Sequence, residues 1–172
     1  SRVVSGNIKP DGTLVLKLYY DRLTFTVSFE SNDGSAVSEI TNVRYDAKIT
    51  KPTDPVKAGF SFAGWYKESG LTNLWDFDTD TVTEDTTLYA KWTPESGTAY
   101  TVEHYKQDVS GTGYTLSETE SLTGTTDASV TANVKSYTGF TENTTHASRV
   151  VSGNIKPDGT LVLKLYYDRL TF

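Results

Sequence analysis

The chain has 172 residues and a formal net charge of −6, which argues against nucleic-acid binding because that function needs a basic surface. It contains no cysteine and no methionine, so disulfides, cysteine-ligated zinc and thiol catalysis are excluded. No apolar run is long enough to cross a bilayer, and we expect no membrane insertion by this segment. β-Branched and aromatic residues are abundant, which favours strands.

Apolar and polar residues alternate in the first part of the chain. This pattern predicts a strand over residues 25–30, which ends at the turn sequence Asn-Asp-Gly of residues 32–34. Further strands are predicted at residues 59–66 and 86–92. Residues 93–99 have the composition of a linker, so we expect a loose connection there.

Strand patterns continue in the second part of the chain. We predict strands over residues 100–106 and 114–122, separated by a turn at residues 110–113. One short helix is predicted for residues 127–134, with Asp127 as its N-cap.

The end of the chain combines a turn with a half-buried strand. The sequence Lys-Pro-Asp-Gly of residues 156–159 predicts the turn, because proline and aspartate suit its first positions and glycine its positive φ. In the strand that follows, residues 160–167, one face is apolar and consists of Leu161, Leu163, Leu165 and Tyr167. Alternation splits the tyrosine pairs at 19–20 and 166–167, so one ring of each pair should face outward.

The first and last 25 residues of the chain are identical. The two copies begin at Ser1 and Ser148, which gives a period of 148 − 1 = 147 residues. Two identical strings that include loop residues such as Asn7 and Asn154 have no physical cause to converge, whereas tandem duplication explains them directly. The sequence therefore predicts one period of a longer repeat array, flanked by a piece of the neighbouring period.

Residues 25–93 resemble the Listeria–Bacteroides repeat, the B-repeat of internalin-type surface proteins. The resemblance is carried by residues 26–34 (TVSFESNDG), Lys51-Pro52, Pro55, residues 59–66 (GFSFAGWY), residues 75–78 (WDFD) and residues 88–92 (LYAKW). Residues 100–169 resemble the MucBP type of mucin-binding-protein repeat. The residues that carry this second resemblance are Thr101-Val102, Thr123-Gly124, Gly139-Phe140, Gly153 and Leu165-Tyr166-Tyr167.

Both resemblances imply small β-grasp, ubiquitin-like modules of Gram-positive bacterial cell-surface proteins. We therefore expect a mainly β, small α+β fold with modules arranged end to end. Residues 1–24 would be the C-terminal hairpin of a preceding MucBP-like repeat, 25–93 the first module, 94–99 a linker, 100–169 the second module, and 170–172 the start of the next repeat. The implied location is extracellular and cell-wall-associated. Neither family implies catalysis.

An aspartate series at residues 76, 78 and 80 has the spacing that opens a calcium-binding loop. Such a loop also needs glycine at its sixth position and glutamate at its twelfth, where this chain has Thr81 and Thr87. We therefore favour a solvated acidic face over a calcium site. Trp75 and Phe77 should then point inward from an edge strand.

The two histidines, His104 and His146, are far apart in the sequence. No G-x-S-x-G elbow is present, so a serine hydrolase is disfavoured. His104 shares a strand face with Val102, which predicts a satisfied and partly buried histidine rather than a catalytic one. His146 lies in a polar loop, where we expect it to face solvent. Residues 111–113 (Gly-Thr-Gly) predict a turn and not a dinucleotide site, because the third glycine is missing.

Six aromatic residues of the first module could form either a core or a sugar-stacking platform: Trp65, Tyr66, Trp75, Phe77, Tyr89 and Trp92. A core is favoured because so small a module needs the area that these rings bury.

For the function, we expect a tandem-repeat stalk or adhesin segment that presents a binding region and takes part in cell adhesion. The alternative is a ligand-binding module for a host glycoprotein or mucin-like glycan.

The expected partners are neighbouring repeats of the same chain and, in the alternative role, that host ligand. The exposed hairpin at the start of the chain also predicts head-to-tail strand exchange with the identical residues 148–169 of another molecule. We expect no enzyme activity, and no catalytic, cofactor-binding or metal-binding residues. No residue pattern identifies ligand-binding residues.

Overall fold

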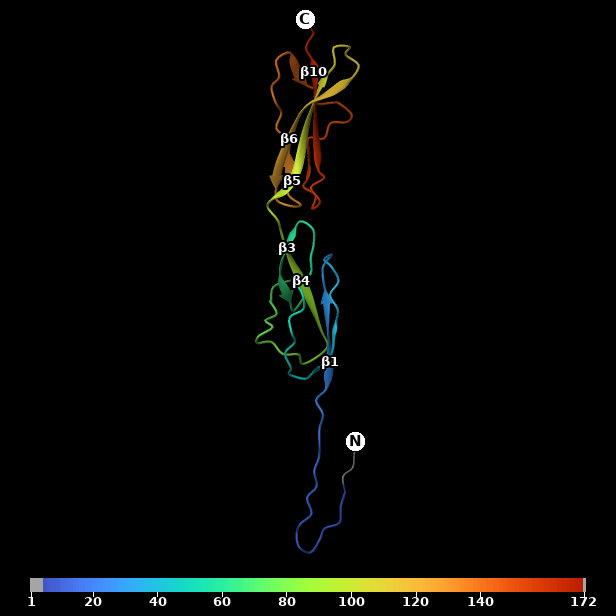
Figure 1. Ribbon diagram of the computed structural model, residues 1–172, viewed down its shortest axis with the longest axis vertical. Coiled ribbons are helices and arrows are strands. Elements are labelled where there is room, and N and C mark those ends of the chain that lie inside the picture. The colour runs from blue at the N-terminus through green and yellow to red at the C-terminus, as the bar shows by residue number, and fades with distance from the viewer. Residues whose placement is uncertain (1–4, 172) are drawn as a thin grey trace.

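The computed structural model describes residues 5–171, which contain ten strands and no helix. Since there is no helix in this part of the chain, none could cross a membrane. The strands form two four-stranded sheets and one two-stranded sheet, and the two larger sheets follow one another along the long axis (Figure 1). The prediction of a mainly β fold is confirmed. The prediction of an additional α-helical part is wrong, because residues 5–171 contain no helix.

The first sheet contains β1 (Thr24–Glu30), β2 (Ile40–Arg44), β3 (Phe60–Tyr66) and β4 (Thr86–Pro94) in the order β2-β1-β4-β3. The two central strands, β1 and β4, are parallel, whereas each edge strand is antiparallel to its neighbour. The chain therefore enters this sheet on one central strand and leaves it on the other.

The second sheet repeats this arrangement with β5 (Thr98–Gln107), β6 (Tyr114–Gly124), β8 (Phe140–Glu142) and β10 (Val162–Arg169). Their order is β6-β5-β10-β8, with β5 and β10 parallel in the centre and antiparallel strands at both edges. The short strands β7 (Ser129–Thr131) and β9 (Ser152–Asn154) pair with each other. Both modules thus have the same topology.

Extended chain forms the long connection of the first module and takes the place of the one helix predicted in the second. In the first module, residues 45–59 connect the two edge strands, and Ile49 from this connection joins the core. Prolines at positions 52 and 55 exclude a helix interior there. In the second module, the predicted helix at 127–134 is wrong. Asp127 has a φ of 63°, which is unsuited to an N-cap, and the residues after it pair with β9 and place Ala132 in the core.

Each module has its own core. The core of the first contains Trp65, Trp75, Val27 and Leu88, with Phe77 and Trp92 packed against it. The prediction of a core role is therefore confirmed for four of the six aromatic residues, whereas Tyr66 and Tyr89 lie outside this cluster. The core of the second module includes Leu161, Leu163, Leu165 and Tyr167, so the predicted apolar face of this strand is confirmed.

Residues 5–23 protrude from the first sheet as an exposed segment (Figure 1). The turn at residues 9–12 is formed, with the Gly12 N–H donating to the Lys9 carbonyl at 3.1 Å. The flanking residues are not in strands, so the hairpin expected for residues 1–24 is not formed within one chain, and residues 1–4 lie outside the described part. An isolated hairpin is marginal in water, and here the strands that would receive it are missing.

Candidate functional site: the joint between the two modules

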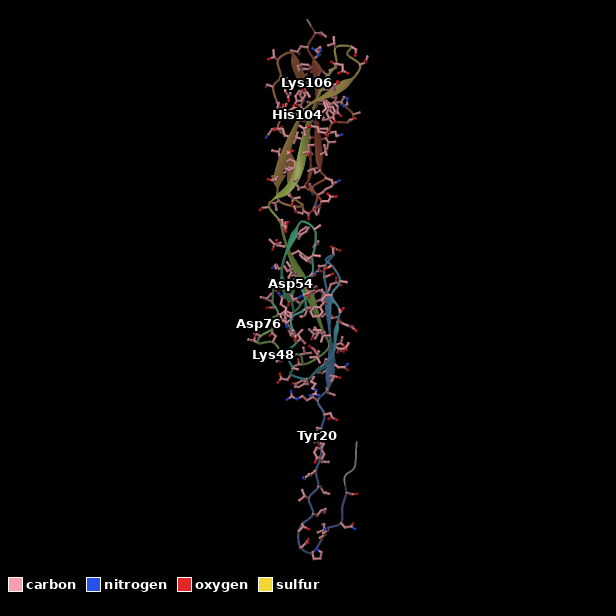
Figure 2. All side chains as sticks on the ribbon, in the orientation of Figure 1. Tyr20, Lys48, Asp54, Asp76, His104 and Lys106 are labelled. Carbon is pink, nitrogen blue, oxygen red and sulfur yellow. The ribbon has the colours of Figure 1, made fainter. Side chains whose placement is uncertain are left out.

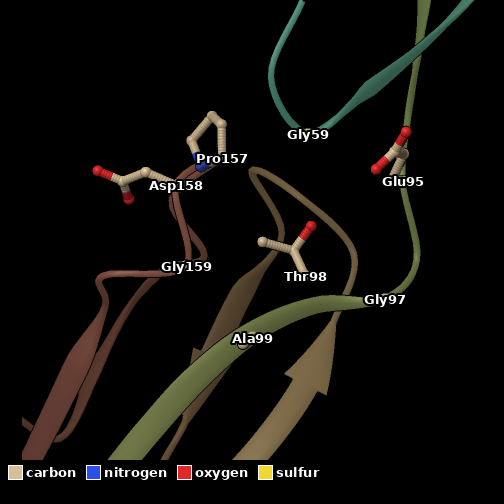
Figure 3. Close-up of a pocket in the computed structure, with 8 residues that line it drawn as sticks. All are labelled: Gly59, Glu95, Gly97, Thr98, Ala99, Pro157, Asp158 and Gly159. Atoms are coloured by element: carbon tan, nitrogen blue, oxygen red, sulfur yellow. The ribbon is translucent and has the colours of Figure 1, made fainter.

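The connection between the modules is short and lies between two strands. Pro94 ends β4 and Thr98 begins β5, so only residues 95–97 are outside a strand, a shorter connection than the linker expected at 94–99 (Figure 3). Because the chain passes almost directly from one sheet to the next, the orientation of the modules depends on what these residues contact.

Glu95 is bonded to both modules through its backbone. Its N–H donates to the Gly59 carbonyl of the first module at 2.9 Å. Its carbonyl accepts from the Thr126 N–H of the second module, also at 2.9 Å. The connecting peptide is therefore restrained on both sides by residues that are distant in the sequence.

Gly59 allows a close approach of the two modules (Figure 3). A Cβ atom at this position would lie 2.9 Å from the Pro157 Cα and 2.9 Å from the Thr126 Oγ1. Gly59 also has a φ of 74°, which disfavours any other residue. Backbone of the first module thus packs against backbone of the second, a contact that only glycine permits.

Two threonines of the second module lie beneath the joint. The Thr98 and Thr126 hydroxyls are buried and 2.6 Å apart, so each satisfies the other. Thr126 also donates its N–H to Glu95. The same residue therefore connects the joint to the interior of the second module.

An open hollow of about 340 Å³ lies beside the joint, and two of its lining residues are the acidic Glu95 and Asp158. The Asp158 carboxylate accepts from the N–H and the hydroxyl of Thr160, and these hydrogen bonds hold its pKa below the usual range. Within residues 5–171 no group of three or more acidic or histidine residues is placed to hold a metal ion.

His104 lies in the second module, away from the joint, and is fully buried (Figure 2). Its Nδ1 is 3.0 Å from the Tyr167 hydroxyl, and its Nε2 is 2.7 Å from Glu120. The hydrogen bond from His104 is the main cause that lowers the pKa of Glu120. The prediction of a satisfied strand histidine is confirmed, with complete rather than partial burial.

His146 does not face solvent as predicted. Its ring stacks on Tyr166 with the centroids 3.7 Å apart. The loop that carries His146 covers the outer face of β10, where Val150 pairs with Lys164. Tyr166 is consequently only 7% exposed, and the prediction that one ring of this tyrosine pair faces outward is wrong because sequence alternation did not indicate the covering loop.

The aspartate series at residues 76–80 forms a turn rather than the predicted edge strand. The Asp80 N–H donates to the Asp76 carbonyl at 2.8 Å, which closes one turn of chain. The Asp80 carboxylate forms a salt bridge with Lys67 at 2.7 Å and accepts from the Asp76 N–H. The inward orientation of Trp75 and Phe77 is confirmed, since both contribute to the core.

Residues 25–91 match the Listeria–Bacteroides repeat domain. The first module is thus similar to Listeria–Bacteroides repeat domains. The prediction for residues 25–93 is therefore confirmed over nearly all of its length. The similarity of residues 100–169 to MucBP-type repeats stays a prediction.

Three curated proteins are similar to parts of the chain. A putative Gly-rich membrane protein of Evansella cellulosilytica is 50% identical over 84 residues, 49% of this chain. A putative membrane protein of the same organism is 57% identical over 68 residues, 40% of this chain. Internalin H of Listeria monocytogenes is 48% identical over 52 residues, 30% of this chain. The chain spans about a tenth of the length of each of these relatives.

A solved structure is also similar to this chain. It contains domains 3–4 of the streptococcal high identity repeats in tandem (SHIRT) of a cell surface protein. The similarity covers 86% of this chain and 99% of that chain, at 15% identity and a TM-score of 0.29.

Proposed function

We propose that this chain is a segment of a tandem-repeat stalk or adhesin of a Gram-positive bacterium, extracellular and associated with the cell wall. In this role it holds a binding region away from the cell. The proposal is supported by the 147-residue period, by the Listeria–Bacteroides repeat domain and by similarity to proteins named as an internalin and as membrane proteins. The two modules would each be a β-grasp variant in which extended chain replaces the helix.

The observation that carries this proposal is the short joint at residues 95–97. A stalk must keep its modules extended, and a freely flexible linker would let them fold back. Here the backbone hydrogen bonds of Glu95 and the contact of Gly59 with Pro157 restrain the angle between the modules.

The strand order also suits a chain under tension. A pull on the two ends of the first module acts on β1 and β4, which are adjacent and parallel over four residue pairs. Force applied at opposite ends of two parallel neighbours shears their hydrogen bonds together, rather than opening them one by one. In the second module β5 and β10 have the same relation over six residue pairs.

The test measures the distance between the modules in solution. The chain contains no cysteine, so cysteines introduced at the exposed positions Thr87 and Thr119 accept spin labels uniquely. We expect one narrow distance distribution by pulsed electron paramagnetic resonance. A broad distribution, like that of a flexible linker, would contradict the stalk proposal.

The alternative role is recognition of a host glycoprotein or glycan. The observation in its favour is the ring of Tyr105, which is half-buried and stacks on Tyr166. Against it, Tyr166 and the large aromatics of the first core leave little ring surface for stacking a sugar. Binding of the chain to a mucin or glycan array would favour this alternative over a purely mechanical role.

A further inference from the structure

The duplicated segment is seen twice in the structure, in two different surroundings. Residues 5–23 precede the first module, and the identical residues 152–170 end the second. The first copy has only the following module beside it, whereas the second copy has only the preceding one. Together, the two sets of contacts describe the segment as it would be with a module on either side.

The contacts of the second copy attach it to the preceding module. The Arg169 N–H donates to the Gln107 side-chain oxygen at 3.0 Å, and its guanidinium lies 4.9 Å from the centre of the Phe140 ring. The Leu170 N–H donates to the Gly139 carbonyl at 2.9 Å. The end of β10 is thereby attached to the end of β5 and to the start of β8.

The contacts of the first copy attach it to the following module. Arg22, the equivalent of Arg169, donates from its Nη1 to the Tyr45 carbonyl at 2.9 Å. The carbonyl of Leu23, the equivalent of Leu170, accepts from the Tyr45 N–H at 2.7 Å. Both contacts involve the turn that follows β2.

The two sets of contacts use different atoms of the same residues. The leucine donates its N–H to one module and accepts through its carbonyl from the other. The arginine side chain has five N–H donors. Arg22 uses its Nη1 for the Tyr45 carbonyl, whereas Arg169 uses its Nη2 for the Gln107 carbonyl, at 3.4 Å. No donor or acceptor of this leucine or this arginine is therefore used in both sets of contacts.

From this complementarity we infer that the duplicated segment is a second restrained joint, which connects the end of one period to the start of the next. The partner is the following repeat of the same chain, and the inference rests on the proposed stalk function. Strand β10 ends at Arg169, and β1 begins at Thr24, which is the equivalent of Thr171. In this joint only Leu170 therefore separates β10 from β1 of the next period.

Exposed apolar residues lie on both sides of this joint. Beside Arg169, an open hollow of about 320 Å³ is lined in part by Val109, Leu116 and Phe140. Val109 and Leu116 are exposed there, and Tyr45 is exposed on the side of the following module. Contact between these surfaces would bury apolar area that neither module buries alone.

The test uses a chain of two periods, made of residues 1–172 followed by a second copy of residues 26–172. Spin labels are placed at Thr119 of the first period and at Thr87 of the second, so that they report across the new joint. We expect a distance distribution as narrow as that measured between Thr87 and Thr119 within one period. Hydrogen exchange should also be about tenfold slower at the second-period copy of Tyr45 than at Tyr45 itself.

The variants are Arg169→Ala and, as a matched control, Arg22→Ala in the same two-period chain. Arg169 then lies at the interior joint, whereas Arg22 is the same residue at the free end. We expect Arg169→Ala to broaden the distribution across the interior joint and Arg22→Ala to leave it unchanged. Arg169→Lys, which keeps the charge but not the planar donor group, should broaden it as well.

Two outcomes would separate this inference from the proposed function. A broad distribution across the interior joint, or equal effects of Arg169→Ala and Arg22→Ala, overturns the inference. If the distribution within one period is still narrow in that case, the stalk proposal stands without the second joint. If both distributions are broad, the stalk proposal fails as well.

Discussion

Gly59 is the residue at which sequence, backbone conformation and module contact depend on one another most closely. Its positive φ and the nearby Pro157 backbone both require the absence of a side chain. A glycine before a strand is common in sequences, and its neighbours along the chain do not reveal that a residue almost a hundred positions later packs on it.

We predict that Gly59→Ala loosens the joint and destabilises the chain by about 1–2 kcal/mol, because alanine is strained at this φ and meets the Pro157 backbone. Thermal unfolding and the distance between labels at Thr87 and Thr119 measure the two effects. Gly97→Ala is the matched control, since an added Cβ there meets no atom within 4 Å. Equal behaviour of the two variants would contradict the role of Gly59.

His104 is a buried polar residue whose role is structural. We predict that His104→Phe keeps an aromatic ring but removes the hydrogen bonds to Tyr167 and Glu120, which lowers the free energy of unfolding of the second module by about 1–3 kcal/mol. Chemical denaturation measures this change. The exposed neighbour Thr119, changed to valine, should shift the same free energy by less than about 0.5 kcal/mol.

Among the elements, the longer strands were predictable and the shorter ones were not. The strands predicted at residues 25–30, 59–66, 86–92, 100–106 and 114–122 are confirmed as β1, β3, β4, β5 and β6, and the strand at 160–167 as β10. Their alternation is long enough to indicate one buried face. Strands β2, β7, β8 and β9 were not predicted, because three to five residues carry too little periodicity.

The second module contains tyrosines that should make it sensitive to alkali. The hydrogen bond from Tyr105 to Glu103 raises the pKa of Tyr105 to about 12, and burial is the main cause that raises the pKa of Tyr137. A raised tyrosine pKa stabilises the fold below the unfolded value of about 10. This contribution is lost as the pH rises from there through the folded value.

We therefore expect the denaturant midpoint of the second module to fall as the pH rises from about 9 to about 12. Tyr105→Phe removes one titrating group and should weaken this pH dependence. Tyr19→Phe, in the exposed segment before the first module, serves as the control. If the unmodified chain and Tyr105→Phe showed the same pH dependence, the loss of stability in alkali would not come from the titration of Tyr105.

At the scale of the whole molecule, the two modules differ in how firmly their central strands are paired. The parallel pairing spans four residue pairs in the first module and six in the second. In single-molecule stretching we expect two unfolding events, with the first module unfolding at the lower force because fewer hydrogen bonds are sheared. Glu103→Pro, in the middle of β5, should lower the force of the second event only. Unfolding of the second module at the lower force in the unmodified chain would contradict this order.

The protruding segment also bears on association between molecules. Its residues Leu16, Leu18 and Tyr20 are exposed, although their equivalents Leu163, Leu165 and Tyr167 are buried in the second core. Figure 2 shows Tyr20 on this segment, outside both modules. Exchange of this segment with residues 148–169 of another molecule would replace like with like and bury these side chains. We predict association of the chain at high concentration by light scattering, and a monomer when residues 1–20 are removed. A monomer mass for both the full chain and the shortened chain at high concentration would rule out exchange.

The duplicated segment separates what the sequence determines by itself from what tertiary structure decides. The Lys-Pro-Asp-Gly turn forms in both copies, with Gly12 donating to Lys9 at 3.1 Å and Gly159 donating to Lys156 at 2.9 Å. This turn depends only on the local backbone preferences of proline, aspartate and glycine, so identical sequence gives identical structure. The repeat period and the alternating faces were likewise readable from the sequence alone.

The strand after that turn forms only where neighbouring strands receive it. Residues 162–169 pair with β5 and β8, whereas the identical residues 15–22 are paired with no strand and are not in a strand themselves. A strand satisfies its backbone groups and buries its apolar face through other strands, which local sequence cannot supply. The same holds for the joint at residues 95–97, for the strand Ser129–Thr131 in place of the predicted helix and for the burial of Tyr166: each depends on contacts between residues far apart in the chain.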